Sequence, residues 1–91
     1  MLEQYEKKAQ LNLKKVQGQV ALIQNMINDK RYCVDVAQQV NAAIGMLRKV
    51  NDLILESHLN TCAAAKLNSK KKEERENFVR DLIYNFRITN K

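Results

Sequence analysis

Apolar side chains recur at intervals of three and four residues along two long segments of the chain, about residues 2–27 and about residues 32–67. This spacing places them on one face of an α-helix. The apolar positions of the first segment are Tyr5, Ala9, Leu13, Val16, Val20, Ile23 and Ile27. Those of the second are Cys33, Val36, Val40, Ala43, Leu47, Val50 and Ile54, continued by His58 and Cys62. The pattern predicts two long amphipathic helices.

A polar stretch at residues 68–72 separates the second segment from a third, over about residues 73–86. The apolar positions of the third segment are Phe78, Val79, Leu82, Ile83 and Phe86. The chain has no proline and only two glycines, and both glycines fall inside the periodic segments rather than in turns. The predicted fold class is therefore all-α, with three helices per chain in a single domain over residues 1–91.

The apolar faces of these helices are too extensive for one short chain to bury. Three helices packed alone would leave much of this surface in water. An antiparallel pairing of the first two helices with their copies would bury it in a four-helix bundle. The sequence therefore predicts a homodimer, whose third helices cover its ends or mediate further assembly.

The second predicted helix carries three soft metal-ligand residues, Cys33, His58 and Cys62, which are the only histidine and the only two cysteines of the chain. His58 and Cys62 are four residues apart, so on a helix they lie one above the other. Cys33 precedes His58 by 25 residues, and 25 steps of 100° return it to within about 20° of the same direction. The same 25 steps separate them by about 37 Å along the axis.

One straight helix therefore cannot close the three side chains around one ion. An antiparallel second copy can place Cys33 of one protomer beside His58 and Cys62 of its partner, and two-fold symmetry then gives two identical sites. Cu(I) accepts two thiolates and one imidazole at low coordination number, whereas Zn(II) would require a fourth ligand. The alternative is that the cysteines are ordinary buried thiols and that the histidine binds no metal.

The chain carries 16 basic and 10 acidic residues, a net charge of +6, which favours a polyanionic partner such as nucleic acid. The alternative interpretation is a solvated basic face. No helix-turn-helix, zinc-finger or RNA-recognition signature is present in the sequence, so DNA binding would depend mainly on phosphate contacts and DNA shape.

No apolar run reaches the ~20 residues that span a bilayer, and no signal peptide is visible, so we expect a cytoplasmic location and no membrane partner. The sequence contains no Ser-His-Asp arrangement, phosphate loop or dinucleotide fingerprint. His58 and Cys62 are the one nucleophile pair that it offers. A fully helical chain of 91 residues provides little pocket for a substrate, and we expect no enzymatic activity.

The segments VQGQVALIQNMINDKRYCVDVAQQVNAA and LESHLNTC resemble the CsoR/RcnR family of bacterial metal-sensing transcriptional repressors, and the resemblance covers roughly residues 11–62. A Cys, a His 25 positions later and a Cys four positions beyond it match the copper-sensing CsoR branch. The nickel and cobalt branch adds a histidine near the N terminus, which is absent here. The formaldehyde branch usually lacks the second Cys, and the persulfide branch lacks the His.

This resemblance implies a disc-like tetramer built from two antiparallel four-helix dimers. It also implies a repressor that sits on operator DNA as the apo-protein and is released by Cu(I), which Cys33 of one protomer binds with His58 and Cys62 of the other. Tyr32 matches a family tyrosine that supports the metal ligands by hydrogen bonding. The corresponding family glutamate aligns best with Asp81, and Glu76 is the weaker candidate.

The expected DNA-contacting face departs further from the family pattern. Asn12 and Gln17 stand where the family usually has arginines, and Lys49 replaces an arginine of the second helix. Lysine lacks the bidentate fork of arginine. The predicted phosphate contacts are Lys14, Lys15 and Lys49.

The leading hypothesis is a Cu(I)-responsive transcriptional repressor that binds operator DNA as a homodimer or homotetramer. One alternative with the same fold is a repressor that senses persulfide or another electrophile through Cys33 and Cys62. The other is a copper-buffering protein that does not bind DNA.

Overall fold

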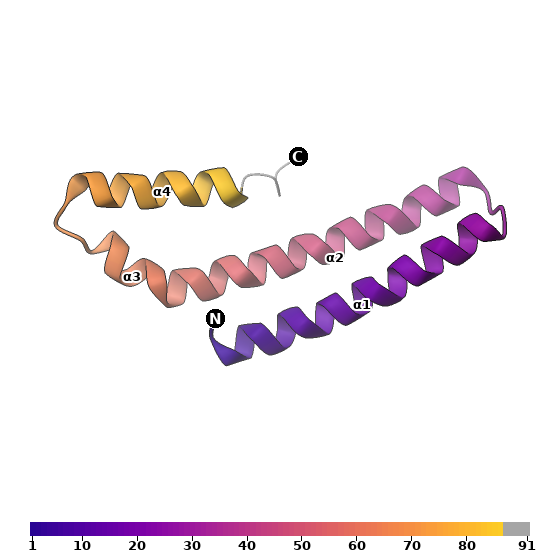
Figure 1. Ribbon diagram of the computed structural model, residues 1–91, viewed down its shortest axis with the longest axis horizontal. Coiled ribbons are helices and arrows are strands. Elements are labelled where there is room, and N and C mark those ends of the chain that lie inside the picture. The colour runs from indigo at the N-terminus through magenta and orange to yellow at the C-terminus, as the bar shows by residue number, and fades with distance from the viewer. Residues whose placement is uncertain (87–91) are drawn as a thin grey trace.

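The computed structural model describes residues 1–86, apart from the side chains of residues 62–64, and contains four helices and no strand within that range. Helix α1 (Glu3–Asn28) and helix α2 (Cys33–Asn60) form a long antiparallel hairpin. The short helix α3 (Cys62–Leu67) then turns the chain, and α4 (Lys72–Phe86) runs back beside the last part of α2 (Figure 1). The prediction of an all-α chain is confirmed.

The prediction of one continuous helix over residues 32–67 is wrong in one respect, because the helix is interrupted at Thr61 (φ −122°, ψ −81°). The Thr61 hydroxyl donates a hydrogen bond of 2.8 Å to the Ser57 carbonyl, which the Thr61 amide would use in a continuous helix. That amide donates instead to the His58 carbonyl, at 3.3 Å. The described part of the chain therefore has four helices rather than the three predicted.

Helices α1 and α2 pack along a seam whose positions are spaced alternately by three and four residues. On α1 the buried or half-buried seam residues are Tyr5, Ala9, Asn12, Val16, Gln19, Ile23 and Met26. On α2 they are Val36, Gln39, Ala43, Met46, Val50, Leu53 and Ser57. This is the heptad spacing of coiled coils. A cluster of Ala9, Val50 and Leu53, with Tyr5 and Ile54 against it, forms the core near the open end of the hairpin.

Polar side chains occupy several seam positions and pair across it. The Gln19 side-chain amide donates to the Gln39 carbonyl at 3.2 Å and also to the Gln39 side-chain oxygen. At the open end, the fully buried Ser57 hydroxyl accepts a hydrogen bond of 2.9 Å from the Leu2 amide. Polar pairs inside an apolar seam favour one register of the two helices, because a shifted register would leave them buried without partners.

The apolar row predicted for the first helix therefore coincides with the seam only in part. Leu13, Val20 and Ile27 are 36%, 45% and 59% exposed, because the residue before each of them takes the seam position. Val40 and Leu47 on α2 also follow seam positions and are 39% and 47% exposed. In an antiparallel pair these two rows lie on the same side of the hairpin. We call these five residues the apolar flank.

No layer within the described part of the chain covers the apolar flank. The molecule measures 59 × 27 × 12 Å, and its shortest dimension is close to the diameter of one helix with its side chains, about 10–12 Å. Helix α4 contributes no fully buried residue, and it turns Phe78, Leu82 and Phe86 towards a cavity shared with α2 and α3. The single chain is a thin layer of helices with one apolar side open.

Candidate metal centre

Cys33 is the first residue of α2, and its thiol is free and exposed. Tyr32 precedes it as the N-cap residue of the helix, with an exposed ring and a carbonyl that accepts the Val36 amide at 3.2 Å. Seven residues separate Cys33 from Val40, so Cys33 extends the row of the apolar flank. A potential thiolate ligand thus stands at the end of α2 that adjoins the α1–α2 turn.

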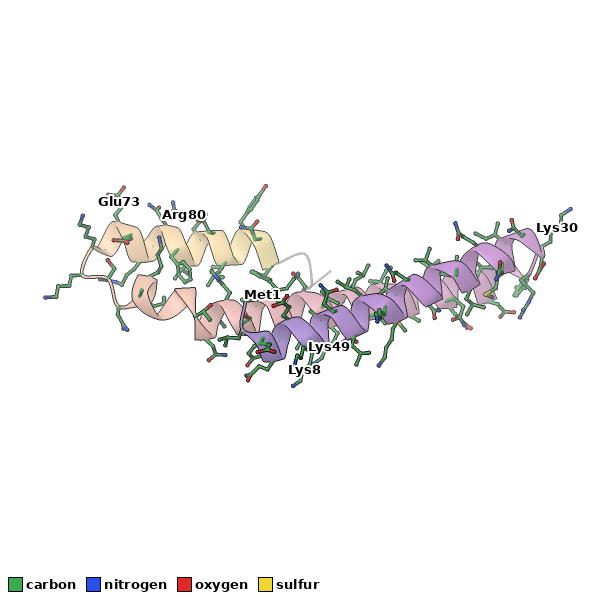
Figure 2. All side chains as sticks on the ribbon, turned by 60° about the horizontal axis from the view of Figure 1, so that its bottom comes forward. Met1, Lys8, Lys30, Lys49, Glu73 and Arg80 are labelled. Atoms are coloured by element: carbon green, nitrogen blue, oxygen red, sulfur yellow. The ribbon has the colours of Figure 1, made fainter. Side chains whose placement is uncertain are left out.

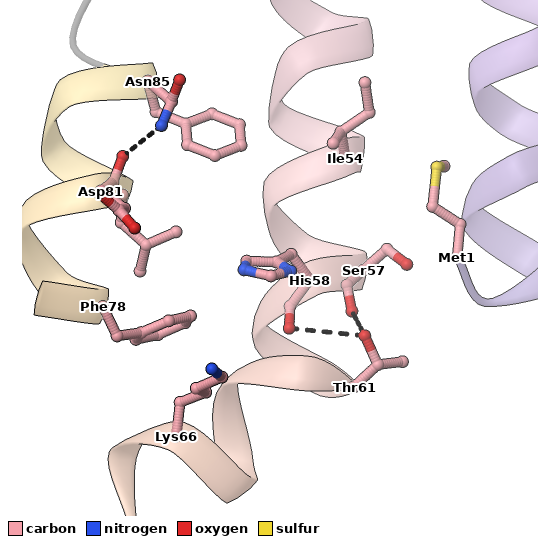
Figure 3. A pocket seen from close by; sticks show the side chains of 11 residues that line it. Met1, Ile54, Ser57, His58, Thr61, Lys66, Phe78, Asp81 and Asn85 are labelled. Carbon is pink, nitrogen blue, oxygen red and sulfur yellow. Dashed lines mark hydrogen bonds between the residues drawn. The ribbon is translucent and has the colours of Figure 1, made fainter. Parts of the chain in front are cut away.

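His58 lies near the other end of α2, and its half-buried ring is turned towards α4 (Figure 3). The centre of the His58 ring is 5.5 Å from that of Phe78, and the two ring planes meet at 37°. The imidazole borders a cavity of about 460 Å³ between α2, α3 and α4. Ser57, Lys66, Asp81 and Asn85 supply other polar groups to the lining of that cavity.

Cys62 begins α3, on the far side of the break at Thr61 from His58. Its side chain lies outside the described residues. The expectation that His58 and Cys62 stack one above the other rested on an unbroken helix, and that premise is wrong here. At this break the Thr61 hydroxyl donates to the Ser57 carbonyl in place of the Thr61 amide, a competition that weakens or bends helices.

Cys33 and His58 do not approach each other within one chain. Both belong to α2, and 25 residues of unbroken helix hold them about 37 Å apart. Accordingly, the described side chains of a single chain contain no group of three histidine, cysteine, aspartate or glutamate residues that could hold a metal ion. A site that includes both residues needs more than one protomer.

The residues predicted to support the ligands are divided between the two ends of α2. Tyr32 adjoins Cys33, whereas Asp81 of α4 lines the cavity beside His58. The competing candidate, Glu76, is 3.7 Å from the Lys72 ammonium and does not belong to the residues that line this cavity. The position of Asp81 makes it the acid of α4 that is better placed to act on the His58 ring.

The basic residues of α1 and α2 lie away from the apolar flank. Lys8, Lys15 and Lys49 each precede a seam residue, which puts all three on the side of the hairpin opposite the apolar flank. Figure 2 shows Lys8 and Lys49 at the same edge of the hairpin, and each precedes a residue of the core cluster, Ala9 or Val50. We call these three residues the basic flank. Lys14, the remaining predicted contact, is exposed on the adjoining surface of α1.

No helix among the described residues is both long and apolar enough to cross a membrane. The structure and sequence are those of a basic, thin helical hairpin with potential soft ligands at both ends of its longest helix.

Comparison with known proteins identifies the family. Residues 5–84 match the family described as metal-sensitive transcriptional repressor. The chain belongs to this family. Its members are transcriptional repressors rather than enzymes, in agreement with the expectation from the sequence.

The relatives of the chain are copper sensors by name. It is 40% identical over 57 residues, 63% of this chain and 56% of the relative, to the copper-sensing transcriptional repressor CsoR of Bacillus subtilis (strain 168). It is 42% identical over 50 residues, 55% of this chain and 52% of the relative, to the copper-sensing transcriptional repressor RicR of Mycobacterium tuberculosis (strain ATCC 25618 / H37Rv). The matched regions thus cover about half the length of these relatives. Among solved structures, none gives a significant match.

The role of Thr61 in breaking the helix can be tested by substitution. Thr61→Ala removes the hydroxyl and introduces the residue of highest helix propensity, so we expect α2 to continue into α3. The backbone Cα chemical shifts of residues 60–62 should then move to helical values. Thr61→Ser keeps the hydroxyl and serves as the control, with shifts close to those of the wild type. Unchanged shifts in Thr61→Ala would mean that the hydroxyl does not cause the break.

Proposed function

We propose that this protein is a Cu(I)-responsive transcriptional repressor, which binds operator DNA as the apo-protein and leaves it when Cu(I) binds. The metal ligands are Cys33 of one protomer with His58 and Cys62 of its partner. Membership of a family of metal-sensitive repressors and the copper-sensing relatives support the general function. The soft donor set, two thiolates and an imidazole, supports Cu(I) as the metal.

The observation that carries the proposal is the placement of Cys33 and His58 at opposite ends of one rigid helix. An antiparallel copy of α2 brings the beginning of one helix to the end of the other, so the two distant ligands become neighbours twice in one dimer. A bound Cu(I) ion would supply a positive charge and a covalent link between protomers at both ends. The protein side chains supply the donors and hold the two helices in register.

The apolar flank supports the dimer. Leu13, Val20 and Ile27 of α1 and Val40 and Leu47 of α2 form a band beside the seam, and Cys33 stands on the same row. Covering such a band with a second hairpin removes it from water, at roughly 25 cal/mol for each Å² of apolar surface. The resulting four-helix bundle would bury the same side that carries Cys33.

A second contact surface supports the tetramer. Val79 and Ile83 of α4 are 41% and 60% exposed and border a hollow with Leu67 of α3. We propose that two dimers associate through these faces of α4. The basic flank then remains outside both contacts and provides the phosphate-binding surface, together with Lys14.

The cross-protomer site can be tested by mixing two inactive variants. Cys33→Ala and the double variant His58→Ala/Cys62→Ala each lack a complete site as homodimers. After subunit exchange, the heterodimer should regain one intact site of two and bind Cu(I) tightly, as measured by competition with a Cu(I) chelator. The same two preparations kept unmixed are the control. Absence of tight binding in the exchanged mixture would contradict the shared site.

The DNA-binding surface can be tested through salt dependence. Lys14→Ala and Lys49→Ala should each reduce the slope of log K against log salt, by about 0.9 for every protomer whose lysine contacts a phosphate. Lys70→Ala, in the link between α3 and α4, removes the same charge away from this surface and should leave the slope unchanged. If all three variants kept the slope of the wild type, Lys14 and Lys49 would not contact the DNA phosphates.

The supporting roles of Tyr32 and Asp81 predict a change in coupling rather than in affinity. Tyr32→Phe and Asp81→Ala should leave Cu(I) affinity nearly intact, because neither residue is a ligand. Each should reduce the loss of DNA affinity that Cu(I) causes, a coupling on the order of 1–3 kcal/mol in the wild type. Glu76→Ala is the control for Asp81. Full coupling in both variants would show that the signal leaves the metal site by another route.

A test of His58 separates copper sensing from the alternative of a thiol sensor. The exposed Cys33 thiol is accessible to electrophiles as well as to metal. His58→Ala should abolish the response of DNA binding to Cu(I), because the imidazole is one of three ligands. DNA release by persulfide that persists in His58→Ala, with no release by Cu(I) in the wild type, would favour the thiol sensor.

A further inference from the structure

The first turn of α1 is tied to the His58 turn of α2 by side-chain hydrogen bonds. The Leu2 amide donates to the Ser57 hydroxyl at 2.9 Å, and the Asn60 side-chain amide donates to the Tyr5 hydroxyl at 3.3 Å. These two contacts span 55 residues of sequence and flank His58 on both sides. We call the four residues Leu2, Tyr5, Ser57 and Asn60 the polar clasp.

Ser57 is the central residue of the polar clasp. Its side chain is fully buried and takes the last seam position of α2, seven residues after Val50. Its carbonyl accepts a hydrogen bond of 2.8 Å from the Thr61 hydroxyl at the break between His58 and Cys62 (Figure 3). Ser57 therefore contacts the break through its carbonyl and the start of α1 through its hydroxyl.

The start of α1 also leads directly to the basic flank. The Leu2 carbonyl accepts the Tyr5 and Glu6 amides at 3.1 and 3.0 Å, so Leu2 begins the first turn of the helix. Lys8 follows within the next turn. A shift of this first turn would move Lys8 relative to Lys15 and Lys49, the other two residues of the basic flank.

We propose that the polar clasp transmits Cu(I) binding from the His58–Cys62 turn to the basic start of α1. The inference rests on the proposed function, because it assigns the route of its regulation. In the proposed site, His58 and Cys62 bind one ion from the two sides of the Thr61 break, and Cu(I) binding is accompanied by an adjustment of the backbone of this turn. Because Ser57 joins that turn to Leu2, the adjustment loosens the clasp, and Lys8 loses the position relative to Lys15 and Lys49 that fits DNA.

Ser57 and Tyr5 are thus positioning residues, and neither is a metal ligand. Each can be altered by the removal of a single oxygen atom, in Ser57→Ala and Tyr5→Phe. Tyr84→Phe, on the exposed side of α4, makes the same chemical change as Tyr5→Phe outside the clasp and is the matched control. Thermal unfolding of each variant establishes that the DNA measurements are made on folded protein.

The decisive quantity is the ratio of DNA affinities without and with saturating Cu(I), measured on the full chain. Couplings of this kind correspond to ratios of roughly 5–150. We expect the double variant Ser57→Ala/Tyr5→Phe to reduce the wild-type ratio by a factor of about three or more, while Cu(I) binding to the DNA-free protein persists. Tyr84→Phe should keep the wild-type ratio. A loss of stability alone would not change the ratio in folded protein.

Hydrogen exchange provides a second measurement on the wild type. The amides of Tyr5 and Glu6 report on the first turn of α1, and we expect them to exchange faster after Cu(I) is added. Unchanged or slower exchange, or a double variant with the wild-type ratio, would overturn the role of the clasp and leave the proposed function intact. A wild-type ratio of one would instead overturn the proposed function, and with it the inference that depends on it.

Discussion

The rigid length of α2 is the constraint on which the proposed organisation of this protein depends. A helix of 28 residues fixes its two ends about 40 Å apart, and its ends carry Cys33 and His58. No rotation of side chains can bring these groups together within one chain. A metal site that includes both residues therefore requires two protomers, because an antiparallel second copy brings its own Cys33 beside His58 of the first. Metal binding and subunit association would then be coupled by geometry.

The α1–α2 seam gives the hairpin two chemically different sides. The heptad spacing leaves one row of apolar residues on one side of the seam and the lysines of the basic flank on the other. Cys33 belongs to the apolar side. This separation allows one surface to be buried between protomers while the opposite surface stays charged and accessible to DNA. The pairs Gln19–Gln39 and Leu2–Ser57 favour the register that keeps the two sides distinct.

The break at Thr61 gives the rigid helix one adaptable point, and it lies between two proposed ligands. A continuous helix would hold His58 and Cys62 in fixed register, whereas a break held by side-chain hydrogen bonds can rearrange by exchanging one acceptor for another. The Leu2 amide at the start of α1 donates a hydrogen bond to Ser57 beside this turn, and the turn also borders the cavity between α2, α3 and α4. All four helices therefore meet at the turn where the ligand geometry is least constrained by helical hydrogen bonding.

The sequence by itself determined the helical class and the boundaries of the first and last helices to within two residues. It also determined that Cys33 and His58 of one chain cannot bind the same metal ion. These follow from periodicity and helical rise, which are local properties. The tertiary structure decided which apolar residues enter the seam, because polar Asn12 and Gln19 are accepted there through pairing and packing that hydrophobicity does not reveal. It also decided the break at Thr61. There the Thr61 hydroxyl competes with the Thr61 amide for the Ser57 carbonyl, and this competition does not change the spacing of apolar residues in the sequence.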